Sequence, residues 1–592
     1  MDDPRKQGPQ QGPIDWSEFI KQAQQSGAGA DFNKIKSRFS HLKKRTIIIA
    51  AVVLVLVLAL AYWWFHPAIN IQSIDLWGFL IVILALVTFV LFVFRQIYQT
   101  GMGKREKSPK KVKLFSGLMA IPIAIAVIGA VGWLASQSFF PGNAEKYSTV
   151  LVTEDADFAT DIPEVNYSEI PFIDKDSAIL LGNRTMGTMA DYVSQFEISD
   201  LYSQINYKGQ PVRVSPLNYA DFFKWWANKD GGIPAYVIVN MSTQDTEIVR
   251  LENPIRYSDS DPFFYNVDRH VQLSHPFYMF DEKSFEINDD GEPFWIYPVQ
   301  KRTIGLFGGT TIQRVVLCNA STGECQDYAI EDVPQWVDRA YPAELLIEQY
   351  NWSGALSGGW INSWLGQNGV KQTTPSTDGK SGFNYIAQDD DVWVYSGVTS
   401  ATADNSIIGC VMINQRTAES KFYSVAGATE ESAMRSAEGQ VQHLQYDATF
   451  PLLINVDGQP TYFMALKDAA GLVKMYAMVD IQRYQNVAVG DTLAATEKSY
   501  KQLLVNQGIN VGGSDASAHP SAGSTSGTIA SISPVVLDGN SHYYLILDGQ
   551  QAIFDCPVAS VVDVVRYKVG DVIVLNHGSS EGNVVLVDSI GE

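Results

Sequence analysis

Three long runs of apolar residues near the N-terminus constrain the fold of this chain most. Residues 46–65, 76–94 and 114–135 contain no Asp, Glu, Lys or Arg. A helix rises about 1.5 Å per residue, so about 20 residues match the hydrocarbon thickness of a bilayer. Uncharged runs of this length are rare in soluble folds. The sequence therefore predicts three transmembrane helices.

Basic residues beside these runs predict their orientation. The segment 1–45 and the loop 95–113 hold all the Lys and Arg residues of the first 114 positions, whereas the loop 66–75 has none. Lys and Arg resist translocation across a membrane. We therefore expect a cytoplasmic tail over 1–45, a basic cytoplasmic loop over 95–113 that lies against anionic lipid headgroups, and an extracytoplasmic portion after residue 135.

The two sides of the predicted membrane differ in charge. Residues 1–114 carry 16 Lys or Arg against 7 Asp or Glu, whereas residues 115–592 carry 27 against 57. A protein that binds nucleic acid regardless of its sequence needs a cationic surface to displace counterions. The acidic extracytoplasmic portion therefore argues against nucleic acid as a partner.

The extracytoplasmic portion is too long for a single core, and its composition divides it. Residues 144–174 are acidic and predict an extended stalk. Residues 175–507 alternate short apolar runs with Gly, Pro and Asp turns, which is typical of β-strands. Residues 508–527 predict a flexible Gly- and Ser-rich linker, and residues 528–592 contain five strand-like runs that fit a small β-barrel of the OB type. The predicted fold class is a membrane-anchored α+β protein with a large β-rich exported domain.

Helical signals are sparse within the β-rich region. The clearest helix is predicted from Glu430 to His443, with Thr429 as its N-cap, because the segment is rich in Ala and other helix formers. A second helix is predicted from Thr492 to Asn506. We expect few helices in the remainder of the region.

One short motif recurs within the β-rich region. Gly232, Gly291 and Gly458 each begin a Gly-x-Pro-x-aromatic sequence, and an apolar run follows each of them. The glycine suits a tight turn, and the proline sets the entry into the strand. The motif therefore predicts three turns that each lead into an antiparallel hairpin.

Two resemblances to known families rest on short segments. Asn319-Ala-Ser-Thr-Gly-Glu resembles the Thr-Gly turn that follows a strand in small PepSY-type domains of exported bacterial proteins. The stretches at 303–309, 333–341, 424–439 and 460–479 resemble those of a family of Gram-positive bacterial envelope proteins that has no assigned function. This resemblance implies a bacterial membrane setting and supplies no catalytic residues.

All four cysteines lie in the predicted extracytoplasmic portion. Cys318 and Cys325 flank a turn-rich segment between two strand-like runs, so the sequence predicts a disulfide across a hairpin. Cys410 and Cys556 lie in apolar runs, and we expect them to be buried thiols.

Carboxylates cluster at three places in the β-rich region. Each cluster puts oxygen ligands within one turn of chain, as a calcium site requires, although none has a complete twelve-residue calcium loop. The alternative is that these residues form turns and carry solvated charge. Apart from calcium, we expect no cofactor. The candidate ligands are Asp259, Asp261, Asp289, Asp290, Asp389, Asp390 and Asp391.

Aromatic residues supply the third kind of candidate site. Trp352, Trp360 and Trp364 lie in a Gly- and Ser-rich segment. They can stack on cell-wall sugars, bind a partner, or rest on the outer lipid headgroups, and the alternative is packing in the core.

The architecture favours a non-enzymatic protein of the cell envelope. We expect the exported β-rich domains to bind or scaffold another envelope component, which can be a protein, a peptide or a cell-wall glycan. The alternative is an extracytoplasmic enzyme that acts on cell-wall or peptide substrates with Asp259 and Asp261 beside His270. The sequence leaves oligomerisation open.

Overall fold

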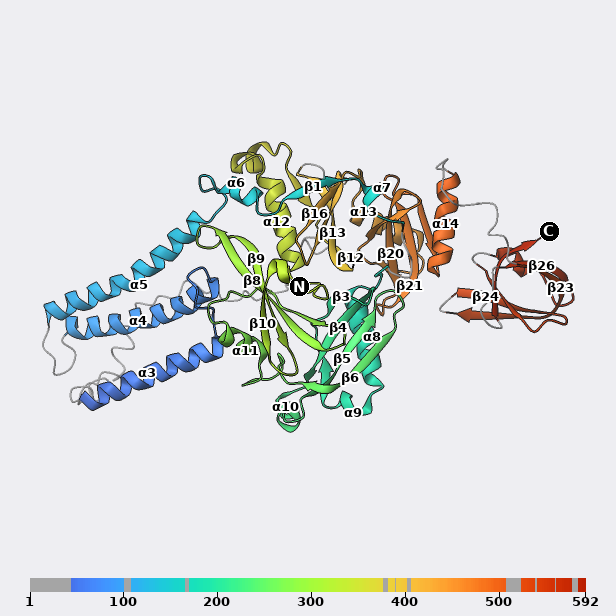
Figure 1. Cartoon of the computed structure of the whole chain (residues 1–592). Helices are drawn as coiled ribbons and strands as arrows, with labels where there is room; N and C mark the ends of the chain where they lie inside the picture. Colours follow the sequence, from blue (N-terminus) through green and yellow to red (C-terminus); the bar gives the residue numbers. More distant parts are fainter. Residues whose placement is uncertain are drawn as a thin grey trace, which may run out of the picture. The chain divides into compact units, whose positions relative to one another are not determined.

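The computed structural model (Figure 1) describes residues 44–100, 108–164, 170–375, 382–388, 390–401, 406–506, 523–537, 540–558, 561–577 and 584–591. Its contacts divide the chain into two units. The first unit comprises residues 1–135 with two short later segments, 272–278 and 305–307, and the second comprises the remainder. The predicted tail before Lys44 and the predicted linker before Gly523 lie outside the described residues.

The first unit contains the apolar helices α3 (Lys44–Phe65), α4 (Ile74–Thr100) and α5 (Pro109–Ala135). By length and composition, α4 and α5 are able to cross a membrane, whereas the described apolar part of α3, Val52–Phe65, is shorter than a span. The side chains of α3 before Val52 lie outside the described residues. Two of the three predicted spans are therefore present as candidate membrane helices.

Aromatic packing joins α4 to α5. The ring of Phe115 stacks on those of Phe94 and Tyr98, each with centroids 5.6 Å apart. Gly129 lies under the indole of Trp77, because a Cβ at this position would come within 2.6 Å of the ring. A small residue here lets the two helices approach closely, as is common between membrane helices. Phe307 meets the same indole edge-on, with centroids 6.0 Å apart.

One sheet of the second unit has five antiparallel strands, in the order β2-β4-β5-β6 with β3 paired to β4. The helices that accompany it are α8 (Lys175–Gly187), α9 (Ala190–Val193) and α10 (Phe222–Asn228). The strands are β2 (Phe196–Ile198), β3 (Ser203–Tyr207), β4 (Gln210–Tyr219), β5 (Ile233–Asn240) and β6 (Thr246–Ile255).

A four-stranded antiparallel sheet follows in the order β10-β9-β8-β7. Helix α11 (Val267–Ser274) precedes it, and the short 3-10 turn η2 (Ile330–Asp332) follows it. The strands are β7 (Ser284–Ile287), β8 (Pro293–Ile304), β9 (Gly308–Asn319) and β10 (Cys325–Ala329).

The third sheet has the order β1-β16-β15-β13-β11, on which β12 pairs with β13. Side chains of its two faces belong to different hydrophobic cores. On one face, Val394 and Val411 pack with Leu346 of α12 (Ala343–Leu356). On the other face, Tyr395 and Met412 pack with the helix α13 (Glu430–Gln440). This burial on both faces explains why residues 392–395 of β13 and 410–413 of β15 are consecutive apolar residues and do not alternate with polar ones. The strands are β1 (Thr153–Ala156), β11 (Lys371–Thr373), β12 (Asn384–Gln388), β13 (Asp391–Ser400), β15 (Gly409–Asn414) and β16 (Ser420–Tyr423).

The fourth sheet, in the order β18-β20-β21-β22 with β19 on β20, completes the body. Its strands are β18 (Asp447–Ala448), β19 (Leu452–Val456), β20 (Gln459–Lys467), β21 (Val473–Asp480) and β22 (Val487–Gly490). The predicted helices occur as α13 (Glu430–Gln440) and α14 (Leu493–Asn506), and the side chain of Thr429 accepts from the backbone N–H of Ser432 as an N-cap does. The short strands β14 (Ser406–Ile407) and β17 (Gly427–Ala428) pair with each other.

The three Gly-x-Pro turns are confirmed. Gly232, Gly291 and Gly458 have φ of 76°, 78° and 77°, a region that favours glycine. The strands β5, β8 and β20 begin within two residues of them, and each pairs antiparallel with the next strand in the sequence.

The predicted stalk over 144–174 is wrong. The described part of this segment contains most of α6 (Asn143–Ser148), the strand β1, which pairs in parallel with β16, and α7 (Phe158–Asp161). The side chains of Leu151, Phe158 and Phe172 are buried. The segment is part of the body because its few apolar residues fill gaps between sheets, and its average acidity hid them.

The C-terminal strands close into a barrel in the order β23-β24-β25-β27-β26. All five predicted strands are present, and the barrel begins at Gly523, inside the predicted linker. Leu545, Phe554 and Leu575 lie in its core. The elements are β23 (Gly523–Leu537), β24 (Asn540–Leu547), β25 (Ile553–Pro557), η4 (Val562–Arg566), β26 (Val572–His577) and β27 (Val584–Gly591).

Candidate functional site

Two cysteines face each other across the β9–β10 hairpin. The antiparallel register places Cys325 opposite Cys318, as the sequence predicts. Opposite residues in such a pair have Cα atoms about 4.5–5.5 Å apart, which is within reach of a disulfide. The two sulfur atoms are nevertheless not bonded in this structure, so the predicted disulfide is not formed there.

The turn between the two cysteines is closely defined. The side-chain oxygen of Asn319 accepts from the backbone N–H groups of Ser321 and Thr322, at 3.0 and 2.9 Å. Gly323 has a φ of 76°, and a Cβ at this position would lie 2.2 Å from the ring of Tyr257. Glycine is therefore needed both for the backbone conformation and for the close approach of Tyr257.

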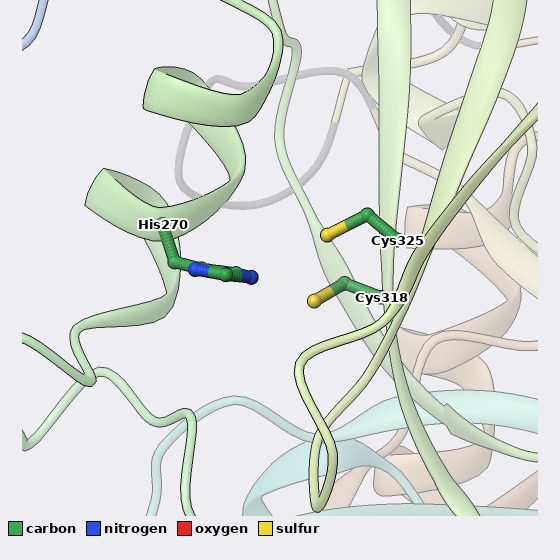
Figure 2. Close-up of side chains that lie close together, drawn as sticks. All are labelled: His270, Cys318 and Cys325. Carbon is green, nitrogen blue, oxygen red and sulfur yellow. The ribbon is translucent and has the colours of Figure 1, made fainter.

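His270 of α11 completes a cluster with the two thiols, as Figure 2 shows. Its Nε2 lies 2.8 Å from the carbonyl oxygen of Gly323, and its ring centroid lies 4.3 Å from that of Tyr257. A carbonyl oxygen only accepts, so Nε2 carries the hydrogen in this contact. The ligand atoms of His270, Cys318 and Cys325 all lie within 4.8 Å of one another. We call these three residues the thiol–imidazole cluster.

Burial and hydrogen bonding shape the acidity of the cluster. Cys318 is buried, whereas His270 and Cys325 are half-buried. A hydrogen bond with Cys325 and burial raise the pKa of the Cys318 thiol well above its ordinary range. The hydrogen bond to Cys325 also raises the pKa of His270, because it and the bond to Gly323 outweigh the effect of burial. The Cys318 thiol is therefore held in its neutral form beside the imidazole.

The same arrangement has two chemical uses. Two thiols at this separation can be oxidised to a disulfide, and two thiolates with an imidazole are soft ligands that suit zinc. Within the part of the chain that the structure describes, this is the one group of three or more His, Cys and acidic side chains that converges tightly enough to hold a metal ion.

The predicted calcium ligands Asp259 and Asp261 serve other contacts. Asp259 pairs with Lys283 at 2.9 Å. Asp261 is buried, accepts from the indole N–H of Trp225 at 2.7 Å, and accepts from the backbone of Phe263 at 2.8 Å. These contacts hold the loop that follows β6.

Those of the remaining acidic candidates that the structure describes also lie apart from any converging group of ligands. Asp391 accepts from Arg416 and Asn414. Asp289 and Asp290 are exposed in the turn before β8, Asp390 is exposed beside β13, and Asp389 lies outside the described residues. The geometry therefore gives no support to calcium at the three predicted clusters.

The alternative of an enzyme that uses Asp259, Asp261 and His270 gains no support either. The three side chains contact Lys283, Trp225 and Gly323, respectively. Each contact has a structural role in its own loop or turn.

The three tryptophan candidates separate into two environments. Trp352 is half-buried and meets the ring of Tyr147 with centroids 4.9 Å apart, so it packs in a small core. Trp360 and Trp364 stack on each other at 6.2 Å and are 39% and 68% exposed, and Trp360 also meets Phe139 at 6.0 Å. The second pair, together with Ile361 and Leu365, forms an exposed aromatic turn around η3 (Asn362–Gly366).

The amino-acid sequence gives no signal that His270 lies beside the two cysteines. His270 lies on a helix that precedes the sheet, and the cysteines lie on two later strands. No spacing pattern of a known metal motif links them, so the signal appears only when α11 packs beside the β9–β10 turn.

A cavity of about 500 Å³ lies between α4 and α5 of the first unit. Its lining is apolar except for Thr88, so it suits an acyl chain or another helix and offers no groups for chemistry. The lining residues include Ile81, Phe89, Phe92, Met119 and Pro122.

Comparisons with known proteins leave the family open. No protein-family model matches the chain, and no curated protein matches it either. Among solved structures, the chain has a slight likeness to an apocarotenoid oxygenase of Synechocystis, at 10% identity, with 52% of this chain and 67% of that chain covered and a TM-score of 0.16. The cobalt-substituted form of that oxygenase gives 7% identity, 50% and 52% coverage and a TM-score of 0.12. At such scores the likeness carries no argument about fold or function.

Proposed function

We propose that this chain is a non-enzymatic, membrane-anchored protein of a bacterial cell envelope whose exported β-rich body binds another envelope protein. The anchoring is supported by α4 and α5, which are long and apolar enough to cross a membrane, and by the uncharged run in α3. The excess of Lys and Arg in segments 1–45 and 95–113 supports a cytoplasmic N-terminus and an extracytoplasmic body.

The observation that carries the binding function is an exposed aromatic surface on α10. Phe222, Phe223 and Trp226 are 51%, 79% and 63% exposed, and Phe264 of the neighbouring loop is 79% exposed. Asp221 caps the helix by accepting from the backbone of Phe223. We call these four exposed residues the α10 aromatic surface.

The α10 aromatic surface rests on a fixed base. Trp225 of the same helix is buried, and its ring lies 5.2 Å from Phe222 and 5.3 Å from Phe263. Its indole N–H donates to Asp261. Because Trp225 holds the helix in place, the outward rings are displayed in a defined arrangement and not on a loose loop, which lowers the entropic cost of binding.

An apolar partner fits this surface best. Large exposed apolar patches on soluble domains commonly mark interaction sites, and aromatic residues are enriched in protein interfaces. Three of the four side chains are phenyl rings without a hydrogen-bonding group, and Trp226 offers one indole N–H, whereas a glycan needs several hydrogen bonds for its hydroxyl groups as well as stacking. The chemistry therefore favours a protein with an apolar docking surface over a cell-wall glycan.

Photo-crosslinking in native membranes tests this function. We would replace Phe223 in the full-length chain by benzoylphenylalanine and expect one discrete protein adduct, identified by mass spectrometry. The same probe at exposed Tyr484 is the matched control. An additional Trp226→Asp substitution should abolish the adduct at residue 223. An adduct with cell-wall material would show that the partner is a glycan and not a protein. Labelling no different from that of the control would refute binding at this surface.

The C-terminal barrel supplies a second contact in this proposal. Its strand order, the parallel pairing of β25 with β27 and the helical turn η4 before β26 support the OB type, whose members bind oligonucleotides or oligosaccharides. Residues 523–592 contain two basic and eight acidic residues, which disfavours oligonucleotides. We assign the barrel to an envelope ligand. The hairpins that follow the Gly-x-Pro turns remain candidates for PepSY-like units.

We also propose that the exposed aromatic turn rests on the outer lipid headgroups. Phe139 follows the end of α5 at Ala135 by four residues, which span at most about 14 Å of extended chain. The ring of Trp360 lies against that of Phe139. If α5 crosses the membrane, the turn therefore lies close to the interface, where tryptophan is favoured.

A further inference from the structure

The thiol–imidazole cluster draws its three donors from three elements. His270 comes from α11, Cys318 from β9 and Cys325 from β10, and their ligand atoms lie within 4.8 Å of one another. Figure 2 shows both sulfur atoms and the imidazole pointing into the same space. A structural disulfide would account for the two cysteines alone and would leave the imidazole unexplained.

The donor set selects the class of metal. Thiolate sulfur and imidazole nitrogen are soft or borderline ligands, and the cluster offers no carboxylate oxygen, so calcium and magnesium do not fit. Two cysteines and one histidine are one of the known three-ligand sets for zinc, with a water or an exogenous ligand in the fourth tetrahedral position. The partial exposure of His270 and Cys325 leaves room for such a ligand on the solvent side.

The surroundings hold the donors before any metal arrives. The carbonyl of Gly323 fixes the imidazole of His270, and Tyr257 packs against both residues. The indole N–H of Trp295 donates to the carbonyl of Tyr257 at 2.8 Å, which ties that residue to β8. Backbone and aromatic supports of this kind orient ligands at metal sites and raise their affinity.

We propose that His270, Cys318 and Cys325 bind a zinc ion, with the fourth position open to water or to an exogenous ligand. Binding releases the two thiol protons to solvent and forms two zinc–sulfur bonds and one zinc–nitrogen bond, with no change in oxidation state. Bound zinc also protects the pair from oxidation to a disulfide. Zinc binding by these residues is independent of the α10 aromatic surface, whereas the orientation of the chain in the membrane decides how readily the two thiols stay reduced.

The test uses the full-length protein in detergent, first stripped with a chelator under a reductant. Zinc should then bind at one equivalent per chain, and Co²⁺ in its place should give a thiolate-to-cobalt charge-transfer band. Cys325→Ser and His270→Gln should each weaken zinc binding by more than about 100-fold, since even losses beyond the direct ligands cost 10- to 100-fold. His443→Gln, at an exposed position, is the matched control and should bind as the wild type does.

Circular dichroism and the melting temperature of each metal-free variant show whether it is folded, and Cys325 is half-buried, so its serine variant should keep the fold. Zinc binding that survives Cys325→Ser would overturn the proposal. So would a reduced, folded wild type that binds no zinc. A protein isolated from its own membranes under anaerobic conditions with Cys318 and Cys325 joined as a disulfide would establish the alternative use of the pair.

Discussion

An ion pair at the start of β13 indicates that Asp391 contributes to the stability of the fold. Asp391 accepts from Arg416 through both carboxylate oxygens, at 2.6 and 2.8 Å, and from Asn414 at 2.7 Å. The carboxylate side chain is only 7% exposed. We expect Asp391→Ala to lower the free energy of unfolding by about 1.5–3 kcal/mol, because it leaves the half-buried guanidinium of Arg416 without its charged hydrogen-bond partner.

Urea denaturation of the full-length protein measures this loss. Asp289→Ala, at an exposed turn, is the matched control and should change the free energy of unfolding by less than about 0.5 kcal/mol. Equal effects of the two substitutions would contradict the structural role of Asp391 and would reopen the question of a ligand at this cluster.

A second pair of carboxyl groups should make stability depend on pH. Burial raises the pKa of both Glu286 and Asp338, and repulsion from Glu286 raises the pKa of Asp338 further. Both oxygens of Glu286 accept backbone N–H groups, from Asp338 and Arg339, whereas Oδ1 of Asp338 has no hydrogen-bond partner. The protonated form is therefore favoured in the folded state. The protonated carboxyl groups therefore add to the free energy of unfolding at a pH below the ordinary carboxyl pKa. This stabilisation is lost as the pH rises through the raised pKa of the folded state.

Asp338→Asn removes the less well satisfied of the two groups. The variant keeps an oxygen that can accept from the backbone N–H of Asn206, as Asp338 does at 2.6 Å. As the pH rises from about 4 to 8, the melting temperature of the variant should fall less than that of the wild type. Asp289→Asn should follow the wild-type profile. Parallel profiles for Asp338→Asn and the wild type would show that Asp338 is ionised without cost.

At the scale of elements, the sequence predicts strands and turns well where one local rule decides. The five barrel strands, the hairpin around Cys318 and Cys325, and the turns at the three glycines follow from alternation and turn chemistry. Helix α12 was missed because seven of its residues are buried, so its apolar residues surround the helix and do not form a stripe. The stalk prediction failed because charge averaged over a segment says nothing of which few side chains pack.

The Gly-x-Pro turns permit a graded test of backbone and steric cost. Gly458 has open space around its position, so Gly458→Ala should lower the free energy of unfolding only through the left-handed backbone conformation, by about 1–2 kcal/mol. A Cβ at Gly232 would lie 2.9 Å from the carbonyl oxygen of Ile255. Gly232→Ala should therefore be the more destabilising of the two in urea denaturation. The opposite order would show that the β5 turn relaxes without cost.

The exposed aromatic turn gives an element-scale prediction about lipid. In nanodiscs with lipids brominated near the headgroup, quenching of tryptophan fluorescence should fall when Trp360→Phe and Trp364→Phe are combined, because bromine quenches only nearby indoles. Trp226→Phe, in the α10 aromatic surface, should leave the quenching unchanged. If the double variant quenches as strongly as the wild type, the turn does not lie at the interface and a partner or a sugar becomes its better ligand.

At the scale of the whole molecule, composition predicts the order of the parts better than their chemistry. Apolar runs, a β-rich region and a C-terminal barrel appear in the expected order, because each has a signature that extends over many residues. The thiol–imidazole cluster has none, since it depends on the packing of α11 beside a turn that is distant in the sequence. What such a chain binds is decided by a few contacts of this kind, which local patterns do not encode.

The charge pattern makes a final prediction about how the chain crosses the membrane. Lys110 in the first turn of α5 and Glu145 after its end are exposed positions on either side of the apolar run 114–135, so they should lie on opposite sides of the bilayer if α5 spans it. In a Cys325→Ser background, a membrane-impermeant maleimide should label Glu145→Cys in intact cells, whereas Lys110→Cys should react only after permeabilisation. The reason for this expectation is that Lys and Arg near the start of α5 resist translocation across a membrane. Labelling of both positions in intact cells would show that α5 does not span, and labelling of Lys110→Cys alone would reverse the orientation and place the thiols in the reducing cytoplasm, where zinc binding would be favoured over the disulfide.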